Sequence, residues 1–304
     1  MLSILIPNFN DNCQNLVYSL AQEIEKLDIE VEVIVGDDAS TNTEIQNSYN
    51  QLENLPYVRL IKNKTNLGRE KTRVLLARAA QYNWLLFLDA DVIPQKKNFI
   101  DLFIKQITKD ENTDVIFGGI KYQEKPTNTQ FLLRWKYGKA NEEQSLKQRK
   151  NNTYKSLVTG AICIQKHVFL KYTLVLNHVY GLDMVLAYQL KKAKTAIKHI
   201  NNAVFHLGLE NNETFVHKTE DALKSIILLE NKNIISNNFR PIQQAFLKLK
   251  KLKLISSCNL IYKTLAKLLV LNLKSNSPNL FCFNLYRMLY FCHLKQVNSL
   301  DNEN

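Results

Sequence analysis

Short apolar runs alternate with helical patterns in the first part of the chain. The runs are rich in β-branched or aromatic residues and too short for buried helices, which predicts strands: "LSILI" (2–6), "VEVIV" (31–35), "YVRLI" (57–61) and "WLLFL" (84–88). The segments 12–27 and 68–82 lie between them and carry apolar residues at about every fourth position. Strands that alternate with helices predict an α/β fold with a mostly parallel sheet and right-handed crossovers.

Polar or acidic residues follow each predicted strand. The four turns read "PNFN", "GDDAS", "NKTNLG" and "DADV". Ligands of such sheets bind at the carboxyl ends of the strands. We therefore expect the four turns to meet at one edge of the sheet and to form a site there.

The pattern after residue 113 is more mixed. We expect strands at 114–120 and 158–164, a mobile loop or acceptor-side excursion at 123–155, a helix at 181–193, a strand and turn at 197–208, and a helix at 218–232. These elements complete a predicted domain over residues 1–235, and residues 236–304 form a predicted basic, amphipathic, helical extension.

The extension is predicted from an apolar stripe and from its charge. The stripe comprises Leu254, Cys258, Ile261, Leu265 and Leu269, while Lys263, Lys267 and Lys274 lie on another side. The chain carries a net charge of +12, and residues 240–304 contain ten Lys or Arg but two Asp or Glu. This suits contact with an anionic membrane surface. Both observations also have explanations without a membrane. The helix could pack on the main domain with its lysines in solvent, and the charge could reflect a chain that is rich in Lys, Asn and Ile throughout.

Composition narrows the class of protein and its compartment. Hydrophobic residues make up 45% and charged residues 22% of the 304 positions, which is ordinary for a globular protein. The nearly neutral first part argues against nucleic acid as a partner. Five cysteines without a C-x-x-C pair favour a reduced compartment. No signal peptide and no 18-residue apolar stretch is visible, so we expect a cytoplasmic protein. Peripheral attachment to the inner face of the membrane is the alternative location.

Asp89 and Asp91 are the strongest candidates for chemistry. They follow the fourth predicted strand, and residues two apart in an extended chain point the same way. Both carboxylates can therefore face one Mg²⁺ or Mn²⁺, which prefers oxygen ligands and often shares them with substrate phosphates. Acids also end strands for structural reasons, but the position in this pattern favours a metal held on a nucleotide diphosphate.

Two other turns offer groups for a nucleotide. Asp38 can accept a hydrogen bond from a base or a ribose, whereas Asp37 is favoured as a structural turn residue, and both could serve turn or capping chemistry instead. In "NLGREKTR" (66–73), Arg73 could reach a phosphate or the base at a helix start, where anions bind well. A solvated helix face is the alternative for Arg73.

Asp183 and His206 complete the candidates. Asp183 opens a predicted helix, so it is either a cap or a general base whose ionised form the helix start favours. His206 in "VFHLG" could complete a metal shell, although a histidine in such a place is more often structural.

Taken together, these stretches resemble the family 2 glycosyltransferases of the GT-A fold. The motifs occur in that family's order over about residues 1–210: "ILIPNFN", "VIVGDDAST", "NLGREKTR", "LLFLDADV", "TGAICIQKHVF" and "GLDMVLAYQLKKA". The resemblance implies a nucleotide-sugar donor, usually a UDP-sugar, and a divalent metal. It also implies an inverting transfer to a hydroxyl of a glycan or lipid-linked glycan.

The resemblance also assigns roles to individual residues. It implies nucleotide contacts from Pro7, Asn8, Asp38, Arg73 and Asp89, metal contacts from Asp89, Asp91 and His206, and catalysis by Asp183.

Three positions depart from the family pattern. Leu182 stands where an acid usually precedes the base, Gln189 replaces an Arg, and Val74 replaces an Asn. These departures support a second interpretation, in which the chain binds a nucleotide or a glycan without catalysis, as a partner protein. A nucleotidyltransferase is disfavoured because "PNFNDN" after the first strand lacks the Gly and Arg of that class's loop.

Overall fold

The computed structural model describes residues 1–176 and 179–301, which divide into two compact units. The first, the sheet unit, comprises Met1–Gln123, Glu142–Val175 and Leu182–Gly208. The second, the helical unit, comprises Glu124–Asn141, Leu176–Gly181 and Leu209–Asn304. These units part near residue 208, whereas the sequence predicts a domain boundary at 235/236, and that boundary stays a prediction.

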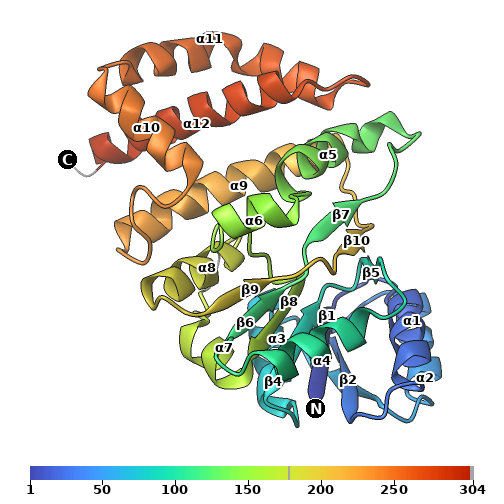
Figure 1. The fold of residues 1–304 in the computed structure, drawn as a ribbon. Coiled ribbons are helices and arrows are strands. Elements are labelled where there is room, and N and C mark those ends of the chain that lie inside the picture. Colours follow the sequence, from blue (N-terminus) through green and yellow to red (C-terminus); the bar gives the residue numbers. More distant parts are fainter. Residues whose placement is uncertain (177–178, 302–304) are drawn as a thin grey trace. The chain divides into compact units, whose positions relative to one another are not determined.

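A seven-stranded, mostly parallel sheet forms the core of the sheet unit (Figure 1). Its strand order is β3 (Val58–Lys62), β2 (Val31–Asp37), β1 (Leu2–Asn8), β4 (Trp84–Leu88), β8 (Ala161–Gln165), β6 (Val115–Phe117) and β9 (Ile197–His199). All neighbouring pairs are parallel except those that β8 makes with β4 and β6. The predicted parallel arrangement of the first four strands is confirmed, so their carboxyl ends lie at one edge.

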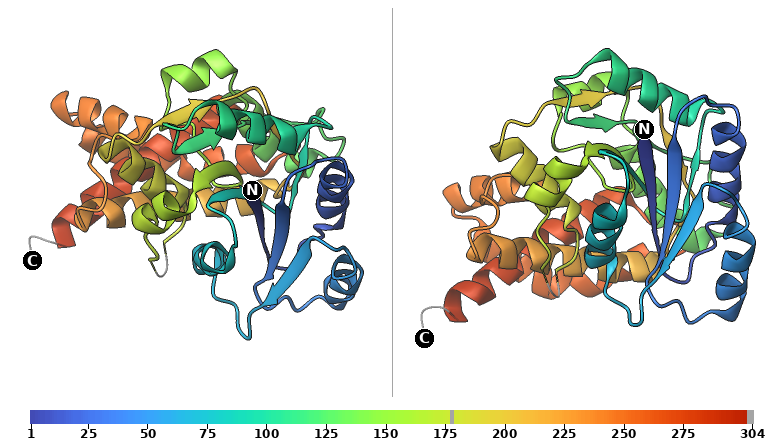
Figure 2. Two further views of the ribbon diagram at one scale, coloured as in Figure 1. Left: turned by 60° about the horizontal axis from the view of Figure 1, so that its bottom comes forward. Right: turned by 90° about the horizontal axis from the view of Figure 1, so that it is seen from below.

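Helices cover both faces of this sheet. They are α1 (Gln14–Ile24), α2 (Thr43–Leu52), α3 (Arg69–Ala79), α4 (Phe99–Lys109), α6 (Leu146–Asn151), α7 (Lys166–Tyr172) and α8 (Asp183–Lys192). Figure 2 shows α1 and α2, in blue, on one side of the first strands and α3, in teal, on the other. Strands enclosed in this way are buried on both faces, as the fully buried Leu85, Leu86 and Phe87 of β4 illustrate.

A small second sheet carries the segments next to the β4 acids. It orders β5 (Val92–Pro94), β10 (Val204–His206) and β7 (Ile120–Tyr122). In the antiparallel β5–β10 pair, His206 lies opposite Val92, the residue after Asp91. This register, and no feature local to either segment, brings His206 beside Asp91.

The strand predicted at 114–120 and the strand and turn predicted at 197–208 are each divided into two strands in the structure. Residues 197–208 form β9 in the large sheet and β10 in the small one. Residues 114–120 contribute β6 to the large sheet and begin β7 in the small one, with Gly118 and Gly119 between them. A Cβ on Gly118 would lie 2.0 Å from the Asn202 carbonyl oxygen, and Gly119 has a φ of +106°. Two glycines therefore let the chain leave one sheet for another.

The loop predicted at 123–155 is also wrong. The segment forms η1 (Thr129–Phe131), α5 (Leu132–Tyr137), the π-helical turn η2 (Gly138–Glu142) and α6. A few buried residues anchor this polar sequence: Leu133 is fully buried, and the buried Arg149 donates to the carbonyl oxygens of Phe117 and Ile200 at 3.1 and 2.9 Å. Ser145 and Gln148 also form a capping box at the start of α6.

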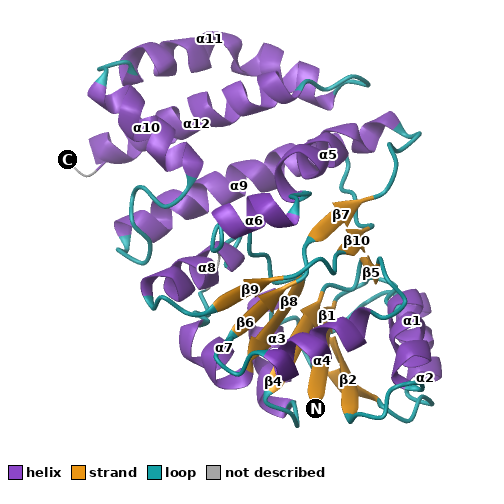
Figure 3. Cartoon of the chain, viewed as in Figure 1, coloured by secondary structure: helices purple, strands orange, loops and turns teal. Residues whose placement is uncertain are grey.

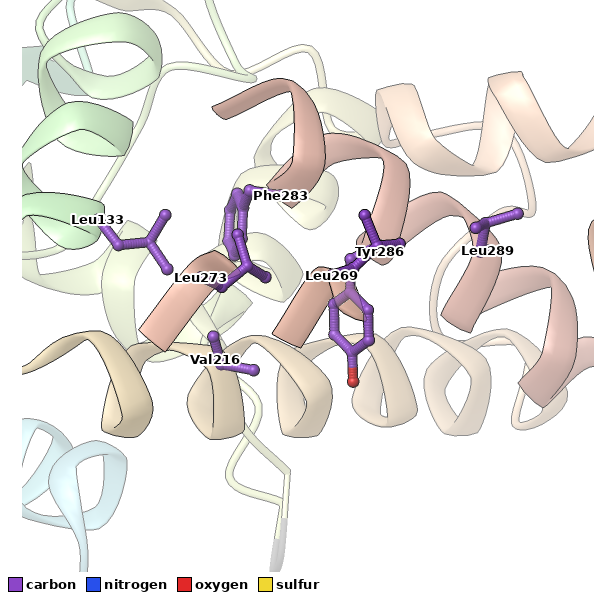
Figure 4. Packing of buried hydrophobic residues seen from close by; sticks show 7 residues of the cluster. All are labelled: Leu133, Val216, Leu269, Leu273, Phe283, Tyr286 and Leu289. Carbon is purple, nitrogen blue, oxygen red and sulfur yellow. The ribbon is translucent and has the colours of Figure 1, made fainter. Parts of the chain in front are cut away.

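Helices and loops alone make up the helical unit within its described residues (Figure 3). After α5 these helices are α9 (Asn212–Asn231), α10 (Pro241–Lys251), α11 (Ile255–Lys274) and α12 (Leu280–Asp301). Figure 4 shows the core shared by α5, α9, α11 and α12, formed by Leu133, Val216, Leu269, Leu273, Phe283, Tyr286 and Leu289. Because α9 contributes Val216 to this core, α9 belongs to the helical unit.

The predicted helical C-terminal extension is confirmed as helical, but its apolar stripe is only partly the packed face. Of the predicted stripe, Leu269 is buried and Cys258 is half-buried, whereas Leu254, Ile261 and Leu265 are exposed. The helix α11 therefore buries a different set of residues from the one that spacing alone suggested.

Candidate active site

The two acids after β4 occupy positions that neighbouring glycines make possible. The Asp89 N–H donates to the Gly160 carbonyl at 3.1 Å, and the Leu207 N–H donates to the Asp91 carbonyl at 2.8 Å. A Cβ on Gly160 would lie 2.5 Å from Asp89 Oδ2, and one on Gly208 would lie 1.9 Å from Asp91 Oδ2. Only glycine leaves room for both carboxylates.

Arg73 of α3 is the centre of a charged network. Its side chain is fully buried, and its guanidinium contacts Asp89 Oδ1 at 2.7 Å, Glu70 Oε1 at 2.8 Å and Asp183 Oδ1 at 3.2 Å. Burial would lower the pKa of Arg73, but Asp89, Glu70 and Asp183 together raise it. A buried cation among three carboxylates is thus held firmly charged.

The same network sets the ionisation of its acids. Burial would raise the pKa of Asp89, but Arg69, 4.0 Å away, and Arg73 hold that pKa below its usual value. Burial raises the pKa of Glu70, with a further contribution from Asp183 that Arg73 opposes. Asp89 is therefore anionic at neutral pH, with Arg69 and the hydrogen-bonded Arg73 as its counter-ions.

Asp183 is held from two elements. It is the first residue of α8, and Leu182 is the N-cap, so Asp183 itself is not the cap. Its Oδ1 accepts from Thr159 Oγ1 at 2.5 Å as well as from Arg73, while its Oδ2 accepts from the Thr159 N–H at 3.3 Å. The orientation of the carboxylate is thereby fixed, with Oδ2 the less engaged oxygen.

Asp91 and His206 form a second pair. Asp91 Oδ2 lies 3.5 Å from His206 Nε2, and both side chains are less than a third exposed. Burial raises the pKa of Asp91, the His206 ring lowers it, and Asp89 raises it. The His206 ring packs on Tyr122 at 5.5 Å between centroids, and its buried Nδ1 has no hydrogen-bond partner within the described chain.

Asp38 organises the turn before α3. Its carboxylate accepts from the N–H groups of Leu67 and Gly68 and from Asn63 Nδ2, each at 2.8 Å. Gly68 has a φ of +84°, a conformation that favours glycine, and α3 starts at the next residue, Arg69. Asp38 therefore fixes the loop that carries Arg69 toward Asp89.

The other predicted residues of this edge have structural partners. Asn8 Nδ2 donates to Tyr49 Oη at 2.9 Å and to the Asp11 carbonyl at 2.8 Å. Asp37 accepts from the Ser40 N–H at 2.9 Å and from Tyr49 at 3.3 Å, which agrees with its interpretation as a structural turn residue. Pro7 lies in β1 opposite Gly36 of β2.

The structure thus brings the predicted residues together to different degrees. Arg73, Asp89 and Asp183 touch directly, and Asp91 pairs with His206. Asp38, Asn8 and Pro7 lie at the ends of β1 and β2 and are joined to this cluster through the turn before α3. Sequence reasoning did not identify Thr159, Glu70, Arg69, Gly160 or Gly208 as parts of the site. The "TG" before β8 was the one local signal for Thr159 and Gly160.

A divalent metal fits Asp91 and His206 best. One carboxylate oxygen and one imidazole nitrogen face each other, and oxygen with nitrogen is a donor set that Mn²⁺ accepts. Asp89 offers Oδ2, because Arg73 holds Oδ1. Within the described residues no three His, Cys, Asp or Glu side chains form a ready metal cage, so substrate oxygens would supply the remaining ligands.

Comparison with known proteins places this geometry in a family. Residues 3–171, more than half of the chain, match the model of the family described as "Glycosyl transferase family 2". A curated relative from Haemophilus influenzae, named "Uncharacterized glycosyltransferase", is 37% identical over 101 residues. That match covers 32% of this chain and 32% of the relative, so the chain spans about a third of the relative's length.

Solved structures share the fold at low sequence identity. The mannosyltransferase PcManGT from Pyrobaculum calidifontis, in complex with GDP-Man and Mn²⁺, is 11% identical and has a TM-score of 0.57, with 100% of this chain and 88% of that chain covered. Glucosyl-3-phosphoglycerate synthase from Mycobacterium tuberculosis, in complex with Mn²⁺, UDP and glucosyl-3-phosphoglycerate, is 15% identical with a TM-score of 0.51, covering 78% and 81%. The GT-A fold and the family resemblance drawn from the sequence are both confirmed.

Proposed function

Because the chain belongs to glycosyl transferase family 2, we propose that it moves a sugar from a nucleotide-sugar to an acceptor hydroxyl, with inversion at the anomeric carbon. The donor is a UDP-sugar, and the acceptor is a glycan or a lipid-linked glycan. The observation that carries this proposal is the meeting of Asp89, Arg73 and Asp183 in one network, beside the Asp91–His206 pair.

Asp91 and His206, with Asp89 Oδ2, would hold a divalent metal beside the donor diphosphate. When bound, the metal supplies Lewis-acid stabilisation of the negative charge on the leaving group. Arg73 keeps Asp89 ionised and oriented, as its 2.7 Å contact supports. Asp38 fixes the loop of Leu67 and Gly68 and presents this edge to the nucleotide, with Pro7 and Asn8 beneath it.

Asp183 is the general base that takes the proton from the acceptor hydroxyl. The proton goes to Oδ2, because Oδ1 already accepts from Thr159 and Arg73. These contacts orient the carboxylate before the acceptor arrives, and general-base help of this kind contributes about 10²–10⁴-fold. Thr159 is a positioning residue in this account.

We propose a reduced, cytoplasmic location for the chain. It is supported by the odd number of cysteines without a C-x-x-C pair, and all five cysteines are free in the structure.

A second candidate function is nucleotide or glycan binding without transfer. It is favoured by Leu182, which leaves Asp183 as the one carboxylate at the start of α8, and by the ion pair that occupies Asp183 Oδ1. In this reading, Asp183 stabilises Arg73 and has no role in proton transfer.

Turnover of a nucleotide-sugar panel separates the two functions. The chain is incubated with UDP- and GDP-sugars, Mn²⁺ and a mixture of glycan and lipid-linked acceptors, and both sugar transfer and donor hydrolysis are measured. Mn²⁺-dependent product that a chelator abolishes is the expected result. Tight, Mn²⁺-dependent donor binding without any product would instead establish the binding function.

A further inference from the structure

The helix α11 has two apolar faces, and its own unit covers one of them. Leu269 and Leu273 face the core of the helical unit and are 8% and 0% exposed. Leu260, Leu268 and Leu271 are 65%, 63% and 66% exposed. Residues spaced by three, four, eight and eleven positions share a helix face, so these leucines form one continuous outer surface.

Two further residues widen this outer surface. Ile261 and Leu265 are also exposed and lie between the leucines on the helix. Isolated exposed apolar residues are normal, but five on one helix face mark a contact surface. We name this set, Leu260, Ile261, Leu265, Leu268 and Leu271, the outer face of α11.

Positive charge borders the outer face. Lys263 and Lys267 are exposed, lie one turn apart along one edge of it, and form no ion pair within the part of the chain that the structure describes. No Asp or Glu occurs anywhere in residues 241–300 of the sequence. The surroundings of the outer face are therefore suited to an anionic partner.

A basic cavity lies where α10 turns into α11. Its volume is about 560 Å³, and its lining includes Lys250, Lys253, Phe246 and Ile255. A third lysine of the lining, Lys295, pairs with Glu230. The lining thus combines the exposed Lys250 and Lys253 with the half-buried Phe246 and Ile255, and its one carboxylate, Glu230, is already paired with Lys295. This combination suits an anionic amphiphile.

The shape of this region suits a surface helix. By length and composition, no single helix of the described chain qualifies as a membrane span, and the α10–α11 pair qualifies only jointly, with a bend of 116° between its members. The 20-residue α11 extends about 30 Å. A helix that is apolar on one long face and edged with lysines is typical of one that lies in the plane of a membrane interface.

We propose that α11 docks on a bilayer that contains anionic lipid. The outer face inserts among the acyl chains, Lys263 and Lys267 contact lipid phosphates, and Lys250 and Lys253 receive a lipid headgroup in the cavity. A second copy of the chain fits this surface less well, because a symmetric contact through the outer face would bring the lysine edges of both copies together without acids to neutralise them. The surface belongs to the helical unit and does not depend on the proposed transfer reaction.

Vesicle sedimentation tests the proposal with the full chain. Vesicles of phosphatidylcholine alone are compared with vesicles that also contain about 30% phosphatidylglycerol, and each lysine near an anionic surface is expected to contribute about fivefold in affinity. The wild type is expected to sediment with the anionic vesicles and to be released by high salt. Lys263→Gln/Lys267→Gln is expected to bind about 30-fold more weakly, and Leu268→Ser/Leu271→Ser is expected to lose binding.

Matched controls keep the result interpretable. Ile29→Ser and Lys147→Gln change exposed residues of the sheet unit and are expected to bind vesicles as the wild type does. Unchanged melting temperature and nucleotide binding of the α11 variants show that they fold. A folded wild type that ignores anionic vesicles would overturn the proposal, as would a dimer in analytical ultracentrifugation that Leu268→Ser/Leu271→Ser dissociates.

Discussion

The sheet unit and the helical unit handle charge in opposite ways. In the sheet unit, the fully buried Arg73 contacts Glu70, Asp89 and Asp183, so each of these four charges has a partner of opposite sign. In the helical unit, lysines stand exposed along α11 in a stretch of sequence without acids. Buried ion pairs in the first unit fix the geometry of its site. In the second unit, Lys263 and Lys267 form no ion pair within the described residues and are left for a partner outside the chain.

Apolar residues show the same contrast. The β4 strand buries Leu85, Leu86, Phe87 and Leu88 completely before its two acids. The helix α11 leaves Leu260, Leu268 and Leu271 more than half exposed. One unit is built around an internal site, and the other presents an apolar surface.

The largest expected effect is the loss of transfer in Asp183→Asn. Asparagine retains hydrogen bonds with Thr159 and Arg73 but cannot accept the acceptor's proton. We expect turnover to fall by about 10²–10⁴-fold with nucleotide binding retained, measured by product formation and calorimetry. Asp101→Asn, an acid of α4 paired with Lys105 on the surface, is the control. Normal transfer by Asp183→Asn would reduce Asp183 to a structural role.

The substitution Arg73→Met tests how much the buried charged network contributes to the unfolding free energy. Removal of the cation leaves Glu70 and Asp89 without the buried counter-ion that they share, which is expected to cost about 3–5 kcal/mol of unfolding free energy. Arg59→Met removes an exposed pair with Glu32 and is expected to cost about 1 kcal/mol or less. If urea denaturation showed the same loss of unfolding free energy for Arg73→Met and Arg59→Met, the buried network would not contribute more than a surface ion pair.

A third expectation concerns pH and His199 of the sheet unit. Burial lowers the pKa of His199 from 6.5 to about 4, and the nearby charges of Arg149 and Lys150 act in the same direction. The Thr153 carbonyl that Nε2 contacts at 3.0 Å opposes this shift, because it favours a protonated ring. As the pH falls, His199 therefore binds a proton in the unfolded chain at a higher pH than in the folded chain. Stability is full above pH 6.5, falls as the pH drops from 6.5 toward 4, and the loss reaches about 3 kcal/mol.

The variant His199→Gln isolates this contribution. Glutamine can still donate to the Thr153 carbonyl but does not titrate. Its unfolding free energy is expected to depend less on pH between 6.5 and 4 than that of the wild type. Parallel pH profiles for the two proteins would show that His199 does not carry the effect.

The smallest effect sharpens the contrast within α11. Leu268→Ala on the outer face is expected to change the unfolding free energy by about 0.5 kcal/mol or less. Leu273→Ala, the same substitution at a fully buried position of the same helix, is expected to cost about 2–5 kcal/mol. Similar costs for both would mean that the outer face is covered within the folded chain.

The sequence predicts the parts of the fold that depend on local pattern. The strands β1 to β4 could be predicted because a strand that is buried on both faces of a sheet appears in the sequence as a continuous apolar run. Their alternation with helices then predicted the edge where Asp38, Asp89 and Arg73 lie. Asp183 and His206 became candidates from their positions at a predicted helix start and in "VFHLG", and the family resemblance then implied the roles that spacing alone could not assign.

Contacts between distant segments could not be predicted. The bond between Thr159 and Asp183 joins residues 24 positions apart and depends on how β8 and α8 meet. The helices within 123–155 depend on a few burials such as Leu133 in a polar sequence. The stripe on α11 was misassigned because leucines occupy both of its faces, and periodicity does not say which face a protein core covers.

Calorimetry of UDP binding to the wild type and to Asp91→Asn, with and without Mn²⁺, tests whether the acids after β4 and His206 bind a metal together with the nucleotide diphosphate. We expect metal-assisted binding, in which Mn²⁺ strengthens UDP binding to the wild type and has little effect on the folded variant, since the variant lacks the carboxylate that faces His206 Nε2 at 3.5 Å. The same Mn²⁺ dependence in both proteins would contradict it.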